Sequence, residues 1–209
     1  MRLVLASNNA KKLKELQALF APLKVEIVAQ GSLGIPEADE PHVTFAENAL
    51  AKARQAARLA HGPALADDSG LCVDALGGAP GVISAHFAGQ LPADADREAT
   101  RTAQDAANNR LLLERLHGVD KRHARFVSTL IAVRSADDPE PLIAIGRWEG
   151  EILRTPAGQG GFGYDPLMFI PALGQAVAAM EPDLKNAQSH RAIAARQMLT
   201  LMREVWRLD

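Results

Sequence analysis

Short apolar runs alternate along the chain with longer segments in which apolar residues recur every three or four positions. Residues 3–6 and 25–29 predict strands, and residues 11–20 between them carry leucine and phenylalanine at helical spacing. A Thr-Phe-Ala-Glu capping box then opens an alanine-rich helix over residues 44–60. The first part of the chain therefore predicts strands that alternate with helices.

The rest of the chain continues this alternation and adds a pair of long strands. The patterns predict short strands at 63–66 and 71–75, a helix at 96–116, antiparallel strands at 125–134 and 142–153, and a terminal helix at 189–208. Residues 31–43, 76–92 and 155–164 predict loops, because glycine, proline or polar residues dominate them. Together these elements favour a single α/β domain over residues 1–209, with a mixed sheet flanked by helices on both sides and a smaller lobe.

The composition narrows the choice of partners. The chain of 209 residues is long enough for a sizeable core, and its 47% hydrophobic and 23% charged residues are typical of a soluble globular protein. Aromatic residues make up 4%, the net charge is −2 and no long basic run is present, so we expect no nucleic-acid partner. The first apolar run is too short for a signal peptide and no run approaches membrane-spanning length. With Cys72 as the single cysteine, these features predict a cytoplasmic protein without a membrane partner.

Two adjacent aspartates, Asp67 and Asp68, lie where the predicted strand at 63–66 ends, and Ser69 and Gly70 after them predict a turn. Neighbouring carboxylates repel each other, so they are tolerated best in water or beside a cation. Mg²⁺ prefers oxygen ligands and would supply that cation. The motif therefore fits either a metal site or a solvated turn.

A polar turn that begins at Ser7 connects the first strand to the first helix. The start of a helix presents free backbone N–H groups to an anion, and Lys11 and Lys12 add positive charge beside them. Lys12 in particular would neutralise a phosphate. The alternative is that both lysines lie on the solvated surface of the helix.

A glycine cluster at residues 158–166 lacks the Lys-Ser/Thr ending of a P-loop and does not follow a parallel strand as a dinucleotide fingerprint does. Its glycines would let the backbone approach a flat ligand, with Phe162 or Tyr164 as a stacking face. The alternative is a tight hairpin with buried aromatic residues.

Ser189 is the expected N-cap of the terminal helix, which places His190 and Arg191 in the first turn. Positive residues at this position oppose the helix dipole. They indicate either a bound anion or electron-rich group nearby, or a mildly destabilised helix start that faces water.

Taken in order, the motifs of this chain resemble those of one family, the noncanonical purine NTP pyrophosphatases, also called inosine triphosphate pyrophosphatases. The resemblance covers nearly the whole chain and rests on Ser7-Asn8-Asn9 through Lys12, Thr44 to Ala49 with Lys52, Ala66 to Leu71, Gly78 to Val82, Gly161 to Pro166, and Ser189-His190-Arg191. The combination is specific, whereas no single motif would suffice.

The resemblance implies a Mg²⁺-dependent homodimer that hydrolyses ITP, dITP and XTP to the monophosphate and pyrophosphate and so removes deaminated purines from the nucleotide pool. It also implies a mixed, strongly twisted α/β fold with two lobes and a central cleft. Asp68 matches the catalytic acid–base position and a metal ligand, and Glu40 matches a second metal ligand. The positions that match substrate contacts are Ser7, Asn8, Asn9, Ala10, Lys11, Lys12, Lys52, Ser69, Phe162, Gly163, Tyr164, Asp165, Lys185, His190 and Arg191.

Some points stay open at the level of sequence. His86 stands where bacterial members of the family carry arginine, the segment 89–125 looks longer than in close relatives, and Asp68 either accepts a proton or only positions the metal. One alternative is a Maf-like nucleotide pyrophosphatase for modified pyrimidines, although that group lacks the Ser-His-Arg ending and the Gly-Phe-Gly-Tyr-Asp-Pro loop. Another is a catalytically silent nucleotide-binding module, which would not need Glu40 and Asp68 together.

Overall fold

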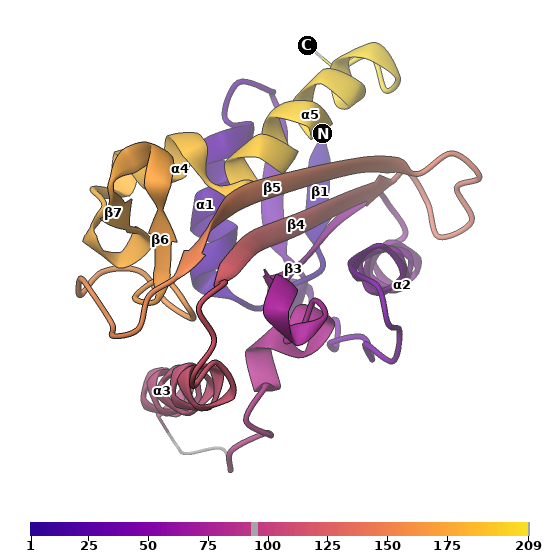
Figure 1. The fold of residues 1–209 in the computed structure, drawn as a ribbon. Coiled ribbons are helices and arrows are strands. Elements are labelled where there is room, and N and C mark those ends of the chain that lie inside the picture. Colours follow the sequence, from indigo (N-terminus) through magenta and orange to yellow (C-terminus); the bar gives the residue numbers. More distant parts are fainter. Residues whose placement is uncertain (93–95, 209) are drawn as a thin grey trace. The chain divides into compact units, whose positions relative to one another are not determined.

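The computed structural model describes residues 1–92 and 96–208 (Figure 1). The chain divides into two compact units. Unit 1 comprises Met1–Ser69, Ser128–Arg147 and Gln188–Asp209, and unit 2 comprises Gly70–Val127 and Trp148–Ala187. The organisation of residues 1–209 as one functional domain stays a prediction.

Seven strands are hydrogen-bonded in the order β2-β1-β3-β4-β5-β6-β7 among the described residues. Their bounds are Arg2–Leu5 (β1), Glu26–Ala29 (β2), Ala64–Val73 (β3), His123–Val133 (β4), Leu142–Ile152 (β5), Met168–Ile170 (β6) and Gln175–Ala176 (β7). β1 runs parallel to β2 and β3, whereas β6 runs antiparallel to β5 and β7. The sheet is therefore mixed, which confirms the predicted α/β fold class.

The helices begin where the sequence places capping residues. The α-helices are α1 (Ala10–Phe20), α2 (Phe45–Ala60), α3 (Arg97–Arg115), α4 (Pro182–Gln188) and α5 (His190–Glu204), with short 3-10 helices at Gln30–Leu33, Asp74–Leu76, Gly81–His86, Pro171–Leu173 and Val177–Ala179. At α2 the Thr44 hydroxyl accepts a hydrogen bond from the Glu47 N–H at 3.2 Å and donates to the Glu47 carboxylate at 2.6 Å. Ser189 caps α5 in the same manner through the N–H of Ala192. Both predicted helix starts are confirmed.

In unit 1, β1 separates two layers of helices. Leu3 and Leu5 pack in one core cluster with side chains of α1 and α5. Val4 and Ala6 pack with the alanines of α2 in another cluster. Because side chains alternate between the two faces of a strand, helices cover both faces of this part of the sheet, as predicted.

In unit 2, Leu112 of α3 and its C-cap Leu116 pack in a core cluster with Leu71 of β3 and Trp148 of β5. The predicted helix at 96–116 is thereby confirmed. The sequence pattern did not predict β6, β7 or α4, because elements of three, two and seven residues are too short to show a period. No helix in the described ranges combines the length and apolar character needed to cross a membrane.

The prediction of a turn at Ser69 and Gly70 is wrong. β3 continues without interruption from Ala64 to Val73 and carries both aspartates inside the strand. Turn propensity is a local preference, and here ladder pairing with the neighbouring strands and the partners of Asp67 outweigh it. The two carboxylates therefore belong to a buried strand and not to a solvated loop.

Candidate active site

Asp67 is a buried anion that gathers side chains from several parts of unit 1. Its side chain is 1% exposed, and its Oδ2 lies 3.0 Å from the Lys12 ammonium and accepts hydrogen bonds from Arg191 Nε and Ser69 Oγ, both at 3.2 Å. Its Oδ1 accepts a hydrogen bond from Ser128 Oγ at 2.8 Å. Burial alone would raise the pKa of Asp67, but the charges of Lys12 and Arg191 hold this pKa well below its ordinary range. Asp67 is thus an ionised group that fixes two cations.

Arg191 lies in the first turn of α5 and is 2% exposed. Its guanidinium donates to Asp67, to the Glu15 carboxylate and to Ser69 Oγ at 3.2 Å. These carboxylates explain why a positive charge is tolerated at a helix start. Gly146 of β5 lets α5 come close, because a Cβ at that position would overlap the His190 carbonyl. The substrate contact that the family resemblance implies for Arg191 stays a prediction, since the contacts described for it are with unit 1 side chains.

Lys52 joins the two carboxylates that the family resemblance assigns to the metal. Its ammonium lies 2.8 Å from Asp68 Oδ1 and 3.0 Å from Glu40 Oε1, and it donates to the Asp67 carbonyl at 3.2 Å. Burial alone would lower the pKa of Lys52, but the two carboxylates raise it above the ordinary value. One ammonium shared by two carboxylates leaves an excess negative charge, and burial together with Glu40 raises the pKa of Asp68 against the opposing effect of Lys52.

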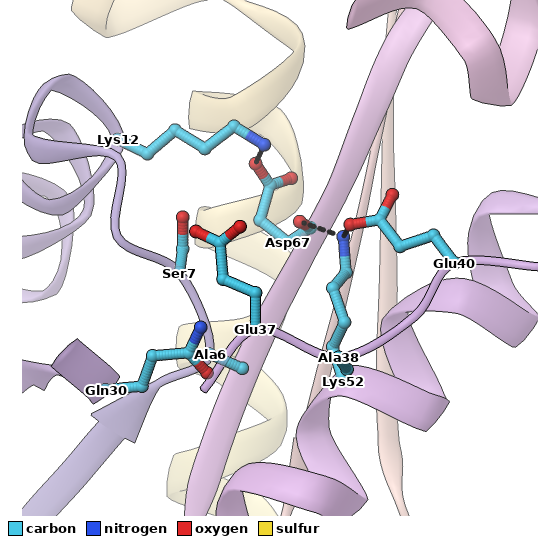
Figure 2. Close-up of a pocket in the computed structure, with 9 residues that line it drawn as sticks. All are labelled: Ala6, Ser7, Lys12, Gln30, Glu37, Ala38, Glu40, Lys52 and Asp67. Atoms are coloured by element: carbon cyan, nitrogen blue, oxygen red, sulfur yellow. Dashed lines mark hydrogen bonds and ion pairs between the residues drawn. The ribbon is translucent and has the colours of Figure 1, made fainter. Parts of the chain in front are cut away.

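Lys12, Glu40, Lys52 and Asp67 line part of a pocket of about 110 Å³ in unit 1 (Figure 2). Figure 2 shows Lys12 and Lys52 reaching Asp67 at different atoms, Lys12 at the carboxylate and Lys52 at the backbone oxygen. The pocket is lined by Ala6, Ser7, Lys12, Gln30, Glu37, Ala38, Glu40, Lys52 and Asp67. Sites that enclose a whole drug-sized ligand are typically about 300–1,000 Å³, so this pocket suits a phosphate-sized group and a cation.

The turn before α1 is already hydrogen-bonded within itself. Asn9 Oδ1 accepts from the backbone N–H of Lys11 at 3.0 Å and of Lys12 at 3.2 Å, and Asn9 N donates to Ser7 Oγ at 3.2 Å. The expectation of free N–H groups is therefore wrong for these three residues, because Asn9 acts as the N-cap. Asn8 instead donates through its side chain to the Glu37 carboxylate at 3.1 Å.

The donor set around Asp68 fits a divalent cation. Asp68 Oδ2 is buried and has no hydrogen-bond partner within the described part of the chain, and such an orphaned carboxylate oxygen is a ready metal ligand. No cluster of three or more His, Cys, Asp or Glu side chains suited to a metal is found among residues 1–92 and 96–208. Mg²⁺ is commonly held by one or two carboxylates together with waters and substrate phosphates. Glu40 and Asp68 match that mode of binding.

The glycine cluster forms a second group of candidate residues, in unit 2. Asp165 Oδ2 accepts hydrogen bonds from the Phe162 N–H at 2.9 Å and from the Lys185 ammonium at 2.6 Å. That ammonium lies 4.6 Å from the centre of the Phe162 ring, within range of a cation–π contact. Tyr164 is buried and its hydroxyl donates to the Ser84 carbonyl at 2.8 Å. Of the two aromatic residues, Phe162 is therefore the stacking candidate, whereas Tyr164 belongs to the core.

The candidate residues thus form two groups. Lys12, Lys52, Ser69 and Arg191 contact Asp67 or Asp68 directly, and His190 is buried in the first turn of α5. The other group, Phe162, Gly163, Tyr164, Asp165 and Lys185, belongs to unit 2. His86 is exposed at the end of the Gly81–His86 turn, and its role stays open.

Sequence reasoning missed three side chains that hold the site together. Ser128 interrupts a buried apolar run in β4, and a polar residue at such a position is a usable signal. Glu15 and Glu37 give no signal of this kind, because acidic residues in a surface helix and in a polar loop are ordinary.

The fold is that of an α/β protein, and its candidate site gathers the buried carboxylates Asp67 and Asp68 with the ammonium groups of Lys12 and Lys52. The sequence model of the Ham1 family matches residues 3–201. A protein named dITP/XTP pyrophosphatase from Methylibium petroleiphilum is 69% identical over 99% of both chains, and one of the same name from Leptothrix cholodnii is 67% identical over the full length of both. A solved HAM1 protein from Coxiella burnetii superposes with a TM-score of 0.88 at 40% identity, covering 98% of this chain and 100% of that one. The chain belongs to the Ham1 family, which favours the first hypothesis from the sequence over the Maf-like alternative.

Proposed function

We propose that this protein hydrolyses ITP, dITP and XTP to the corresponding monophosphate and pyrophosphate, with Mg²⁺ as cofactor. The relatives named dITP/XTP pyrophosphatase, similar over the whole chain, support the reaction and the substrates. The observation that carries the chemistry is the cluster in which the buried Lys52 joins the buried Asp68 to the more exposed Glu40, next to a pocket of phosphate size. A binding module without activity would have no use for two carboxylates that share one cation.

Glu40 and Asp68 are the residues that would hold the metal. When bound, Mg²⁺ would neutralise phosphate oxygens and stabilise the leaving pyrophosphate. Asp68, with its pKa raised by burial, would hold the proton of the attacking water on a carboxylate oxygen. Lys52 keeps the two carboxylates at their positions through contacts of 2.8 and 3.0 Å.

Lys12 is the residue proposed to bind the β- and γ-phosphates. The chain carries a net charge of −2, so the site must supply its own positive charge to a triphosphate. Asp67 fixes the Lys12 ammonium at the edge of the pocket at 3.0 Å, whereas the charge of Lys52 is already balanced by Glu40 and Asp68. A lysine placed in advance lowers the cost of ordering it around the ligand.

The base is proposed to be recognised by Phe162 and Lys185. ITP and XTP carry an acceptor at purine C6, whereas ATP carries an amino donor there. A donor such as the Lys185 ammonium satisfies the carbonyl but stays unpaired against the amino group, and a mismatch of this kind can reject an analogue strongly. Phe162 offers a ring for stacking that is indifferent to the C6 substituent.

The homodimer implied by the family resemblance and the cytoplasmic location predicted from the sequence features belong to the same proposal. Light scattering coupled to size-exclusion chromatography tests the dimer directly, and a mass of one chain at micromolar concentration would contradict it.

The reaction itself is tested by hydrolysis of ITP in ¹⁸O-labelled water with Mg²⁺, followed by ³¹P NMR and mass spectrometry. The expected products are IMP and pyrophosphate, with the label in IMP because water attacks the α-phosphorus. Release of orthophosphate, or label in pyrophosphate, would contradict the proposal.

A further inference from the structure

Helix α3 presents a polar face whose side chains bind two loops of unit 2. Gln104 and Asn108, one turn apart, hold the segment that ends the Gly81–His86 turn: Gln104 Nε2 donates to the Gly89 carbonyl at 2.8 Å, and Asn108 Oδ1 accepts from the Ala88 N–H at 2.9 Å. The neighbouring pair, Asp105 and Asn109, contacts the glycine cluster instead. α3 therefore serves as a common support for both loops.

Asp105 and Asn109 bind opposite sides of a single residue. Asp105 Oδ2 accepts a hydrogen bond from the Gly163 N–H at 2.7 Å, and Asn109 Nδ2 donates to the Gly163 carbonyl at 2.8 Å. Gly163 has φ +62, a left-handed conformation that favours glycine. Its backbone conformation is thus fixed on both sides by one helix.

Asn109 makes this contact at a cost. Its Oδ1 is buried and finds no hydrogen-bond partner among the residues that the structure describes. A buried acceptor without a partner is unfavourable, and an apolar residue at this helix position would avoid the penalty. The bond to the Gly163 carbonyl accounts for the asparagine.

Gly163 lies directly after Phe162 and two positions before Asp165, the residues whose side chains make the Lys185 contacts described above. A rotation of the backbone at Gly163 would turn the Phe162 ring and the Asp165 carboxylate together. The two bonds from α3 therefore set the geometry of the whole base loop, defined here as residues 162–165.

We propose that Asp105 and Asn109 are positioning residues that fix the base loop and so maintain discrimination between 6-oxopurine and 6-aminopurine nucleotides. This inference rests on the proposed function, because it assumes that the loop reads the purine. Neither residue touches the base; both act through the backbone of Gly163. A hydrogen bond lost here corresponds to about a 2- to 10-fold change in an equilibrium, and a misplaced recognition group can change a rate by about 100-fold.

The first measurement does not depend on activity. Hydrogen–deuterium exchange of peptides covering the base loop is compared in unliganded wild type, Asn109→Ala and Asp105→Ala. We expect faster exchange at the Gly163 amide in both variants, at unchanged melting temperature within a few degrees. Gln104→Ala is the matched control. It also removes a buried amide from α3, but the wild-type Gln104 side chain binds the other loop, at Gly89 and Leu91. Unchanged exchange in both Asn109→Ala and Asp105→Ala would overturn the inference that these residues fix Gly163.

The second measurement compares kcat and KM for ITP and for ATP. We expect Asn109→Ala and Asp105→Ala to raise KM for ITP and lower the ITP-to-ATP ratio of kcat/KM by about 10-fold or more, while Gln104→Ala keeps the ratio. Asp105→Asn should recover most of the ratio, because its amide oxygen still accepts from the Gly163 N–H. An intact ratio in an active enzyme would overturn the inference alone. A wild-type protein that does not hydrolyse ITP would overturn the proposed function and, with it, the role of Asp105 and Asn109 in specificity. The exchange measurement would still show whether these two residues fix the base loop.

Discussion

The Lys52 ammonium lies 2.8 Å from Asp68 Oδ1 and is also 3.0 Å from Glu40 Oε1, so two carboxylates of unit 1 share one buried cation. The shared position lies between the two groups that are proposed to hold Mg²⁺. The charge of the site therefore depends on both Lys52 and the metal. Substitutions of the lysine and of the carboxylates should change this charge in opposite directions.

Asp68→Asn should lower kcat for ITP by about 10²–10⁴-fold or more, because the change removes a charge that serves both the metal and the proton. The protein should stay folded, since the amide keeps the shape of the carboxylate. Steady-state kinetics at saturating Mg²⁺ and circular dichroism check both statements. Asp74→Asn, an exposed partner of Arg125, is the control and should keep normal turnover. A near-normal kcat for Asp68→Asn would refute its role.

Lys52→Met should lose stability in metal-free buffer, because it leaves the buried Asp68 carboxylate and the more exposed Glu40 carboxylate without their cation. Breaking a buried ion pair costs about 3–5 kcal/mol. Added Mg²⁺ should restore part of this loss, since a ligand that binds only the native state stabilises it. The measurement is the melting temperature with EDTA and with Mg²⁺. An equal response to Mg²⁺ in wild type and variant would speak against a metal at this position.

Lys12→Ala should weaken the binding of ITP far more than the binding of IMP, because Lys12 is proposed to contact the β- and γ-phosphates and not the α-phosphate. A charge-assisted contact contributes about 1.5–3 kcal/mol. Isothermal titration calorimetry with an inactive Asp68→Asn background compares the two ligands. Lys14→Ala, on the exposed side of the same helix, should change neither affinity. Equal losses for ITP and IMP would place the Lys12 contact elsewhere.

Asp67→Asn should destabilise the protein at neutral pH and flatten its acid denaturation profile. The pKa of Asp67 is lower in the folded than in the unfolded chain, so its contribution is present above the unfolded pKa of about 4 and is lost as pH falls below it. Wild type should therefore lose stability more steeply than the variant on acidification. Urea denaturation at several pH values measures this slope. Asp137→Asn, an exposed carboxylate, should retain the wild-type slope, and a wild-type slope in Asp67→Asn would contradict the assignment.

Local signals predicted the parts of the fold that depend on local chemistry. The capping residues Thr44 and Ser189 fix helix starts through bonds to amides three positions away. The continuous apolar run at residues 3–6 makes both faces of the first strand apolar, which agrees with helices on both faces of the sheet. These features follow from sequence because both partners lie within a few residues.

The role of Asp67 and the continuity of β3 do not follow from sequence in this way. Ser128 and Arg191, which hold the Asp67 carboxylate, lie 61 and 124 positions away along the chain. The sequence shows the local preference of Asp-Ser-Gly for a turn. It does not show the tertiary contacts that override this preference. The hydrogen bonds from α3 to Gly163 could not be predicted from sequence for the same reason, since Asn109 and Gly163 are 54 positions apart.

The most direct test of the central claim is the kcat/KM for pyrophosphate release from ITP, dITP and XTP, measured beside ATP and a modified pyrimidine triphosphate, with Mg²⁺ and with EDTA. We predict that the three oxopurine nucleotides exceed ATP by about 10²–10⁴-fold and that EDTA removes the activity. A rate for ATP equal to that for ITP, a preference for the pyrimidine, or full activity in EDTA would contradict the account.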